Sequence, residues 1–335
     1  MSSKDLGDGA FWMGGRYATG LQEISNDPRS LADGNFWAVS TTFEGEYTFA
    51  RFANVSDQEF VSNEKWQPLN SKWASSISKL DYEKYVQRIR EEISVGNVYQ
   101  VNACRRLSTD LSDERNLAPL FVEILKANPA PYASYLQLPG IQIASASPEL
   151  FLDRSADVIK TSPIKGTKHL GTPEFGEKDA SENIMIVDLM RNDFGRISEP
   201  GSVKAGELLR HELHPGLEHL VSDVYGQLRN AISWTEIFSE LSPAGSISGT
   251  PKYSAVQIIK EQEQIKRGPY CGLLGWIEGD QALLSVAIRI FWHQDNLLHF
   301  GAGAGITWDS DPSGEWEETE LKAERLLKIS GGERT

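Results

Sequence analysis

The sequence predicts an α+β fold, and three observations support this prediction. The first ~70 residues contain short apolar runs bounded by turn-forming residues, which is typical of a small antiparallel layer. From Val98 onward, strand-like and helix-like segments alternate irregularly, and pairs of neighbouring strands separate the helices. No dinucleotide fingerprint or phosphate-binding loop is present, because GAGAG at 301–305 lacks the required glycine spacing and a downstream lysine.

The composition limits the classes of protein to consider. The chain has 335 residues, 40% of them hydrophobic and 24% charged, which is enough to form one large core. The net charge of -14 argues against nucleic-acid and membrane partners, because both require a basic surface. Two cysteines, no signal-peptide pattern and no apolar run of ~18 residues predict a reduced, cytoplasmic protein.

No repeat or linker divides the chain, so we predict a single catalytic domain over residues 1–335. A short β-rich part at 1–80 precedes the region 81–330, which carries the motifs below. The first long helix is predicted over 81–97, with Asp81 as its N-cap. One face of this helix is apolar at helical spacing and comprises Tyr82, Tyr85, Val86, Ile89 and Ile93.

The other elements follow from apolar periodicity and from turn-forming residues. The predicted strands are 36–43, 46–55, 98–107, 131–138, 141–147, 149–154, 271–279, 282–292 and 297–306. The predicted helices are 117–128, 182–195, 234–242, 251–265 and 316–329.

Carboxylates occur near the start of two predicted helices. Glu182 opens the helix 182–195, and Glu318 lies in the first turn of the last helix, near Glu317 and Glu320. Each has an ordinary explanation, since acidic residues favour helix N-termini and Glu318 is spaced to pair with Lys322. Two such carboxylates brought together would nevertheless form the oxygen-rich site that Mg²⁺ prefers.

The segment 211–220, HELHPGLEHL, contains His211, His214 and His219. Pro215 and Gly216 predict a turn between the second and third histidine, and no Cys or His cluster elsewhere completes a zinc shell. We therefore favour a polar or acid–base role for one of these histidines over a metal site.

Arg289 lies in the predicted strand SVAIRIF, where it shares one face with the small residues Ser285 and Ala287. Its guanidinium therefore has room to bind a carboxylate with two hydrogen bonds. The glycines of GAGAGI and of the loop 242–252, SPAGSISGTPK, let main-chain N–H groups approach an anion. Together these features are compatible with an anionic substrate.

The segment 161–166, TSPIKG, places a lysine in a stiff, apolar stretch. Pro163 fixes its own φ and favours extended geometry at Ser162, and Gly166 allows close approach of the backbone. Lys165 is either a surface lysine with an apolar stem, which is the common case, or a residue held in place for chemistry.

In order along the chain, a series of segments resembles the chorismate-binding enzyme family across about residues 80–330. The family comprises anthranilate synthase component I, aminodeoxychorismate synthase component I, and isochorismate and salicylate synthases. The resemblance implies their shared fold, a large antiparallel β-sandwich-like core flanked by helices. The segments are SASPELF, SPIKGT, ENIMIVDLMRND, EHLVSDV, GSISGTPK, GPYCGLLGWI, SVAIRIF, GAGAGITWDSDP and ETELKAERLL.

Within the family, SPIKGT is similar to the PIKGT of aminodeoxychorismate synthases, where anthranilate synthases carry PIAGT. Isochorismate and salicylate synthases carry a lysine base at the position that Gln100 occupies, so the resemblance argues against addition of water. The implied reaction converts chorismate and ammonia into 4-amino-4-deoxychorismate, on the path to p-aminobenzoate and folate.

The resemblance also implies roles for single residues. Lys165 would attack C2 of chorismate as the C4 hydroxyl leaves, and Glu149 would be the general acid and base. The pKa of Lys165 should therefore be lowered by its apolar neighbours. Mg²⁺ would be held by Glu182 and Glu318. The remaining matching positions are Arg289, Tyr270, Gly303 and Gly305 for polar groups of the substrate, together with His219, Lys252 and Thr250, the last replacing the commoner alanine of SGAPK.

Two further expectations concern partners and alternatives. The chain has no cysteine in a glutaminase context, so a glutamine amidotransferase subunit is expected to supply ammonia unless free ammonia is used. Only about 80 residues precede the matching region, so a full tryptophan-binding subdomain is not expected. The alternatives are an anthranilate synthase, an aminodeoxyisochorismate synthase, or a non-catalytic chorismate-binding regulatory subunit.

Overall fold

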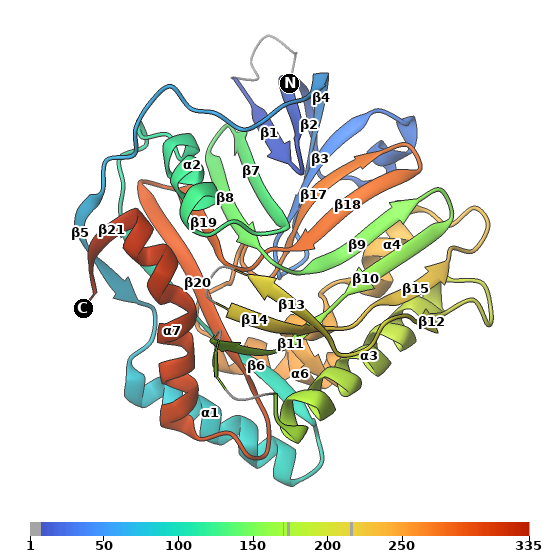
Figure 1. Ribbon diagram of the computed structural model, residues 1–335, viewed down its shortest axis with the longest axis vertical. Coiled ribbons are helices and arrows are strands. Elements are labelled where there is room, and N and C mark those ends of the chain that lie inside the picture. The colour runs from blue at the N-terminus through green and yellow to red at the C-terminus, as the bar shows by residue number, and fades with distance from the viewer. Residues whose placement is uncertain (1–7, 170, 173–174, 215–216, 335) are drawn as a thin grey trace.

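Antiparallel strands with helices packed against them make up the structure, and the computed structural model describes it for residues 8–169, 171–172, 175–214 and 217–334 (Figure 1). This is the predicted α+β fold with a strand-rich core flanked by helices. The helices are α1 (Lys79–Ser94), α2 (Ala118–Ala127), α3 (Glu177–Ile197), α4 (Trp234–Leu241), α5 (Gly245–Ser248), α6 (Lys252–Gln262), α7 (Pro312–Ser330) and the 3₁₀ helix η1 (Pro28–Asp33). The strands are β1 (Ala10–Met13), β2 (Arg16–Ser25), β3 (Phe36–Thr41), β4 (Tyr47–Asp57), β5 (Leu69–Ser75), β6 (Gln100–Asp110), β7 (Tyr132–Leu138), β8 (Ile141–Ser147), β9 (Leu150–Ser155), β10 (Val158–Ser162), β11 (Ile164–His169), β12 (Lys204–Ala205), β13 (Arg210–His214), β14 (Leu217–Val221), β15 (Val224–Gln227), β16 (Gly249–Thr250), β17 (Leu273–Glu278), β18 (Gln281–Val286), β19 (Ile290–Gln294), β20 (Leu297–Ile306) and β21 (Gly331–Arg334).

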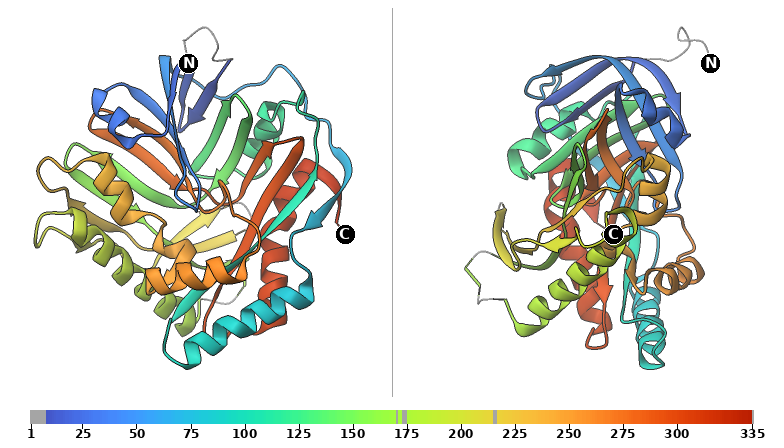
Figure 2. Two further views of the ribbon diagram at one scale, coloured as in Figure 1. Left: turned by 180° about the vertical axis from the view of Figure 1, so that it is seen from behind. Right: turned by 90° about the vertical axis from the view of Figure 1, so that its right-hand side faces the viewer.

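Most strands form one antiparallel series that folds into two halves. In one half, β6, β20, β19, β8 and β7 pair in that order. In the other half, β3, β17, β18, β9, β10 and β15 do so. The strands β1, β2 and β4 connect the halves. The small sheet β11–β14–β13 lies between the halves in Figure 1, and Figure 2 shows α4 and α6 on the opposite face.

Two crossings carry the chain from one half to the other, and they lie side by side. β8 pairs with β19 in the first half, and β9 pairs with β18 in the second. The β8–β9 crossing contains Glu149, and the β18–β19 crossing contains Arg289. The two crossings are joined by hydrogen bonds from Ser147 Oγ to Val286 O (2.6 Å) and from Val286 N–H to Glu149 O (3.1 Å). The fold therefore brings together two residues that are far apart in the sequence.

The prediction of one unbroken strand over 282–292 is wrong. β18 ends at Val286 and β19 begins at Ile290, so Ser285 and Arg289 do not share a strand face. Arg289 has a φ of 53°, which a residue with a side chain adopts rarely and which turns the chain out of the strand. Apolar periodicity alone does not report such a break.

Three predicted helix starts are also wrong. α7 begins at Pro312, with Asp311 as its N-cap, and not at residue 316, so Glu318 lies in its second turn and not in its first. α1 begins at Lys79, because Ser78 and not Asp81 is the N-cap, and Ser78 Oγ accepts the N–H of Asp81 at 3.1 Å. α3 begins at Glu177, where the carboxylate of Asp179 accepts the N–H of Gly176 at 3.0 Å. Glu182 consequently lies in the second turn of α3. The predicted apolar face of α1 is confirmed: Tyr82, Tyr85, Val86 and Ile89 are buried, and Ile93 is half-buried against the same core.

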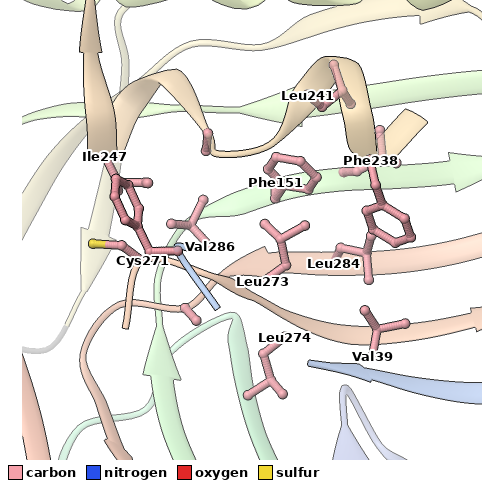
Figure 3. Packing of buried hydrophobic residues seen from close by; sticks show 14 of the residues in the cluster. Val39, Phe151, Phe238, Leu241, Ile247, Cys271, Leu273, Leu274, Leu284 and Val286 are labelled. Atoms are coloured by element: carbon pink, nitrogen blue, oxygen red, sulfur yellow. The ribbon is translucent and has the colours of Figure 1, made fainter. Parts of the chain in front are cut away.

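The core packs between the helices and the second half of the strand series. Figure 3 shows Phe238 and Leu241 of α4 beside Phe151, Leu273 and Leu284 of β9, β17 and β18. Each fully buried side chain of this size stabilises the fold by roughly 1.5–3 kcal/mol relative to an exposed one. None of the helices in the described part of the chain is both long and apolar enough to cross a membrane.

Candidate active site

Lys165 lies just after the chain leaves β10 and enters β11. Its side chain points at β20, and Nζ is 3.2 Å from the place that a Cβ on Gly305 would occupy. Burial lowers the pKa of this amine because the charged form loses hydration, while Glu182, Glu149 and Glu318 act in the opposite direction. The lowered pKa that the sequence predicts is therefore confirmed in direction. Lys165 is half-buried, and its amine faces three carboxyl groups.

Glu149 is the second ionisable group of the site and is only 4% exposed. Burial raises the pKa of Glu149 to about 7. A hydrogen bond from Ser246 and the charges of Lys165, Lys322 and Arg289 lower this pKa, but burial has the larger effect. Near neutral pH the group therefore exists in both protonation states, which suits a general acid and base.

Glu182 and Glu318 approach Lys165 from different helices, α3 and α7. Lys322 Nζ contacts Glu318 Oε1 at 2.6 Å and donates to Gly303 O at 3.0 Å. No group of three His, Cys, Asp or Glu residues within the described ranges is arranged to hold a metal. The donors present fit Mg²⁺, which keeps several waters and needs only one or two protein carboxylates besides its substrate ligands.

Arg289 and His219 form a buried polar pair beside these groups. Arg289 Nη2 lies 3.4 Å from His219 Nε2, and His219 is 1% exposed. Burial lowers the pKa of Arg289 to about 10, so the guanidinium keeps its charge at neutral pH. An anion that enters the site would therefore meet a permanent cation.

The three histidines of segment 211–220 do not converge. In the β13–β14 ladder, His219 lies opposite Glu212, so these two side chains share one face of the sheet. His211 precedes Glu212 and lies opposite Leu220, so it points to the other face. His211 Nδ1 is exposed and pairs with Glu218 at 2.6 Å. The side chain of His214 lies outside the described residues. The preference for a polar role of one histidine agrees with the position of His219.

The glycines of β20 form a strand face without side chains. The pairing of β19 with β20 ends at Phe300, while β6 pairs with β20 as far as Ile306. Lys322 donates to Gly303 O from the edge away from β6, so the N–H groups of Gly303 and Gly305 face this edge too. These N–H groups are placed as an anion would require.

The other three predicted binding residues are held by contacts within the protein. The ring of Tyr270 covers Gly301, about 13 Å along the strand from Gly305. Lys252 donates to Asp193 at 2.7 Å and to Leu241 O at 3.2 Å, which joins α6 to α3 and α4. Thr250 pairs with Gln100, and its carbonyl accepts the N–H of Tyr99 at 2.8 Å. Their contacts with substrate stay predictions.

Sequence reasoning missed several residues that complete the site. Ser246 hydrogen-bonds Glu149, and its carbonyl accepts Asn102 Nδ2 at 2.8 Å. Asn183 Nδ2 donates to Lys165 O at 3.4 Å and to Leu220 O at 2.9 Å. Both residues lie inside motifs that the sequence singled out, but a polar residue beside a stronger candidate gives no separate signal.

The site combines an amine with a lowered pKa, a carboxyl group with a raised pKa, two helix-borne carboxylates and an arginine, which is the kind of group that active sites gather. Residues 22–328 match the family described as chorismate binding enzyme, and the chain belongs to this family.

Relatives of known activity include two kinds of synthase. The chain is 36% identical over 292 residues to aminodeoxychorismate synthase component 1 of Escherichia coli, covering 83% of this chain and 64% of the relative. It is 35% identical over 289 residues to anthranilate synthase component 1 of Aquifex aeolicus, covering 83% of this chain and 56% of the relative. The chain thus spans little more than half of the length of these relatives.

Solved structures show the same fold. Anthranilate synthase component I from Streptococcus pneumoniae superimposes with a TM-score of 0.80 at 22% identity, covering 96% of this chain and 90% of that one. The menaquinone-specific isochorismate synthase of Escherichia coli gives a TM-score of 0.83 at 17% identity, covering 98% and 89%. The expected fold is therefore confirmed.

Proposed function

We propose that this chain is the chorismate-converting component of an aminodeoxychorismate synthase, which makes 4-amino-4-deoxychorismate from chorismate and ammonia. The observation that carries the proposal is the half-buried Lys165 of SPIKGT, whose pKa is lowered and whose amine faces Glu149, Glu182 and Glu318. A lowered pKa increases the fraction of the amine that is neutral, and only the neutral amine has the lone pair that a nucleophile needs.

In the first half of the reaction, the C4 hydroxyl leaves and a bond forms between Lys165 and C2. The amine lone pair of Lys165 forms a bond to C2, the ring double bonds shift, and the C4–O bond breaks. Glu149 supplies the proton with which the hydroxyl leaves as water. The carboxyl form of Glu149 persists up to about pH 7, so this proton is present under ordinary conditions.

In the second half of the reaction, the ring double bonds return to their original positions. Ammonia forms a bond to C4, the double bonds move back, and the bond between C2 and Lys165 breaks, which returns the neutral amine. The Glu149 carboxylate takes the surplus proton from the new amino group. Chorismate and ammonia thus give the amino product and water, and the enzyme groups end as they began.

Binding would use the cations and open N–H groups of the site. Arg289 would hold one substrate carboxylate, and the N–H groups of Gly303 and Gly305 would face an anionic oxygen. Mg²⁺ held by Glu182 and Glu318 would neutralise the other carboxylate and favour loss of the hydroxyl. A glutamine amidotransferase subunit would supply ammonia.

Replacement of the nucleophile tests the proposal. Lys165→Ala should abolish formation of the amino product while chorismate still binds in the presence of Mg²⁺, as measured by calorimetry. Lys168→Ala, in the same strand but paired with Glu218 at 3.1 Å, is the matched control and should retain turnover. Full turnover by Lys165→Ala would show that this amine does not react.

The second candidate is an anthranilate synthase, which the relatives of that name support at 35% identity. This reaction would give fluorescent anthranilate and pyruvate directly from chorismate. The lysine of SPIKGT favours the first candidate, because the resemblance places alanine at this position in anthranilate synthases.

A further inference from the structure

A cavity of about 210 Å³ lies apart from the Lys165 site, between the start of α1, β6 and the segment after α6. Its wall combines apolar and aromatic surface with an excess of cationic side chains. Ile77, Tyr85 and Ile265 supply the apolar part, and Arg105, Arg106 and Arg267 are among the cations. This gathering of positive charge is unexpected in a chain with a net charge of -14.

Three of the four cations on this wall are already neutralised. Arg105 pairs with Glu320, and Arg267 pairs with Glu263 at 2.7 Å. Lys266 pairs with Glu46 at 2.8 Å. These three side chains therefore need no ligand to balance their charge.

The two carboxylates of this wall, Glu263 and Asp81, already accept hydrogen bonds from other groups of the protein. Glu263 Oε1 accepts the N–H of Cys104 at 3.1 Å as well as the guanidinium of Arg267. Asp81 accepts from Lys84 Nζ at 2.8 Å and from Ser78 Oγ at 2.7 Å. Neither is left to neutralise the fourth cation.

Arg106 is this fourth cation. Among the residues that the structure describes, no hydrogen-bond partner is found for its buried Nε, and its Nη1 donates to the carbonyl of Lys266 at 3.4 Å. The charge of Glu44 acts on Arg106 from a distance, while its two oxygens accept the main-chain N–H groups of Arg267 at 2.7 Å and Gly268 at 3.2 Å. The Arg106 side chain is half-buried, and its buried Nε can donate to an acceptor that enters the cavity.

We propose that this cavity binds a small organic carboxylate with an aromatic body. Arg106 takes the carboxylate, and the body lies against Tyr85, Ile77 and Ile265. The wall includes Tyr270, whose ring covers Gly301 of β20, but neither Lys165 nor Glu149 is among the lining residues. The proposal does not depend on which reaction Lys165 performs.

Benzoate is the simplest probe of this chemistry, and benzamide is its uncharged counterpart. Titration of the whole chain by calorimetry should show benzoate binding and at least tenfold weaker benzamide binding, because a charged hydrogen-bonded pair is worth about 1.5–3 kcal/mol. Equal affinity for the two probes, or no benzoate binding at millimolar concentration, would overturn the proposal.

Variants locate the site. Arg106→Gln should weaken benzoate binding by about tenfold or more, whereas Arg29→Gln, an exposed arginine paired with Asp27, should leave it unchanged. Arg289→Gln should also retain benzoate binding. Loss of benzoate binding in this variant would place benzoate in the Lys165 site instead. Unchanged binding by Arg106→Gln would likewise contradict the proposal.

A milder variant keeps the test valid if Arg106→Gln does not fold. Arg106→Lys preserves the charge but loses the planar fork, so benzoate affinity should fall while the circular dichroism spectrum and melting temperature stay close to those of the unmodified chain. Affinity equal to that of the unmodified chain would show that the guanidinium does not hold the carboxylate.

Discussion

Glu149 and Lys165 have pKa values shifted toward each other, and burial is the main cause of both shifts. The pKa of Glu149 rises to about 7 and that of Lys165 falls, because each group loses more hydration in its charged form than its neighbours return. The raised pKa of Glu149 lets this group exchange protons with a substrate near neutral pH, and the lowered pKa of Lys165 increases the neutral fraction of its amine.

The raised pKa of Glu149 predicts a pH dependence. Its acid form persists up to about pH 7 and is lost above it, so kcat/KM should fall as pH rises through 7 when free ammonia is held constant. Glu149→Gln should reduce kcat by roughly 10²–10⁴-fold. A flat profile between pH 6 and 8 in the unmodified chain would contradict the acid role.

At the level of elements, α3 is fixed to the strands that carry the site. Asn183 donates to the carbonyls of Lys165 and Leu220 and accepts from Ser222 Oγ at 2.5 Å. It is 1% exposed, so each of these groups depends on it. The residue next to it is Glu182, and the position of this carboxylate therefore depends on the same hydrogen bonds.

Asn183→Ala should lower the free energy of unfolding by about 1–3 kcal/mol, because it leaves buried polar groups without partners. Urea unfolding followed by fluorescence measures this change. Asp188→Ala, on the exposed side of the same helix, is the control and should shift stability by less than about 0.5 kcal/mol. A similar loss in both variants would mean that the hydrogen bonds of Asn183 contribute nothing specific.

The glycine face of β20 gives a second prediction at this scale. A Cβ on Gly305 would lie 3.0 Å from Asn102 Oδ1 and 3.2 Å from Lys165 Nζ, and it would overlap Gln100 Nε2. Gly305→Ala should therefore reduce turnover strongly. Measured kcat and KM equal to those of the unmodified chain would show that this face does not border the reaction.

At the scale of the whole molecule, the two halves depend on the first part of the chain. β1 pairs with β7, β3 pairs with β17, and β5 pairs with β6. A fragment that begins at residue 77 would expose three strand edges and the apolar surface beneath them. We expect it to lack cooperative thermal unfolding, and a fragment with a sharp transition and dispersed amide resonances would contradict this.

Part of the fold could be predicted from the sequence because several strands are short apolar runs that are almost wholly buried. The positions of β7, β8 and β9 were predicted within one residue at each end. The break at Arg289 was not predicted, because it depends on a backbone angle that is set by the rest of the fold. The start of α3 at Glu177 was not predicted either, because it depends on a local hydrogen bond between Gly176 and Asp179.

The candidate site was predictable only in part for the same reason. The motifs pointed to Lys165, Glu149, Glu182, Glu318 and Arg289, and the structure brings these charges within range of one another. Ser246 hydrogen-bonds Glu149 in the β8–β9 crossing, and Asn183 hydrogen-bonds the carbonyl of Leu220. These contacts join segments that are distant in the sequence, so no periodic pattern in the sequence predicts them.

Identification of the product tests the central claim most directly. The chain is incubated with chorismate, Mg²⁺ and ¹⁵N-labelled ammonium, and the products are analysed by mass spectrometry and NMR. Our account predicts one product, 4-amino-4-deoxychorismate, with ¹⁵N bonded to C4 and no release of pyruvate. Labelled anthranilate with an equal amount of pyruvate, or isochorismate without label, would contradict it.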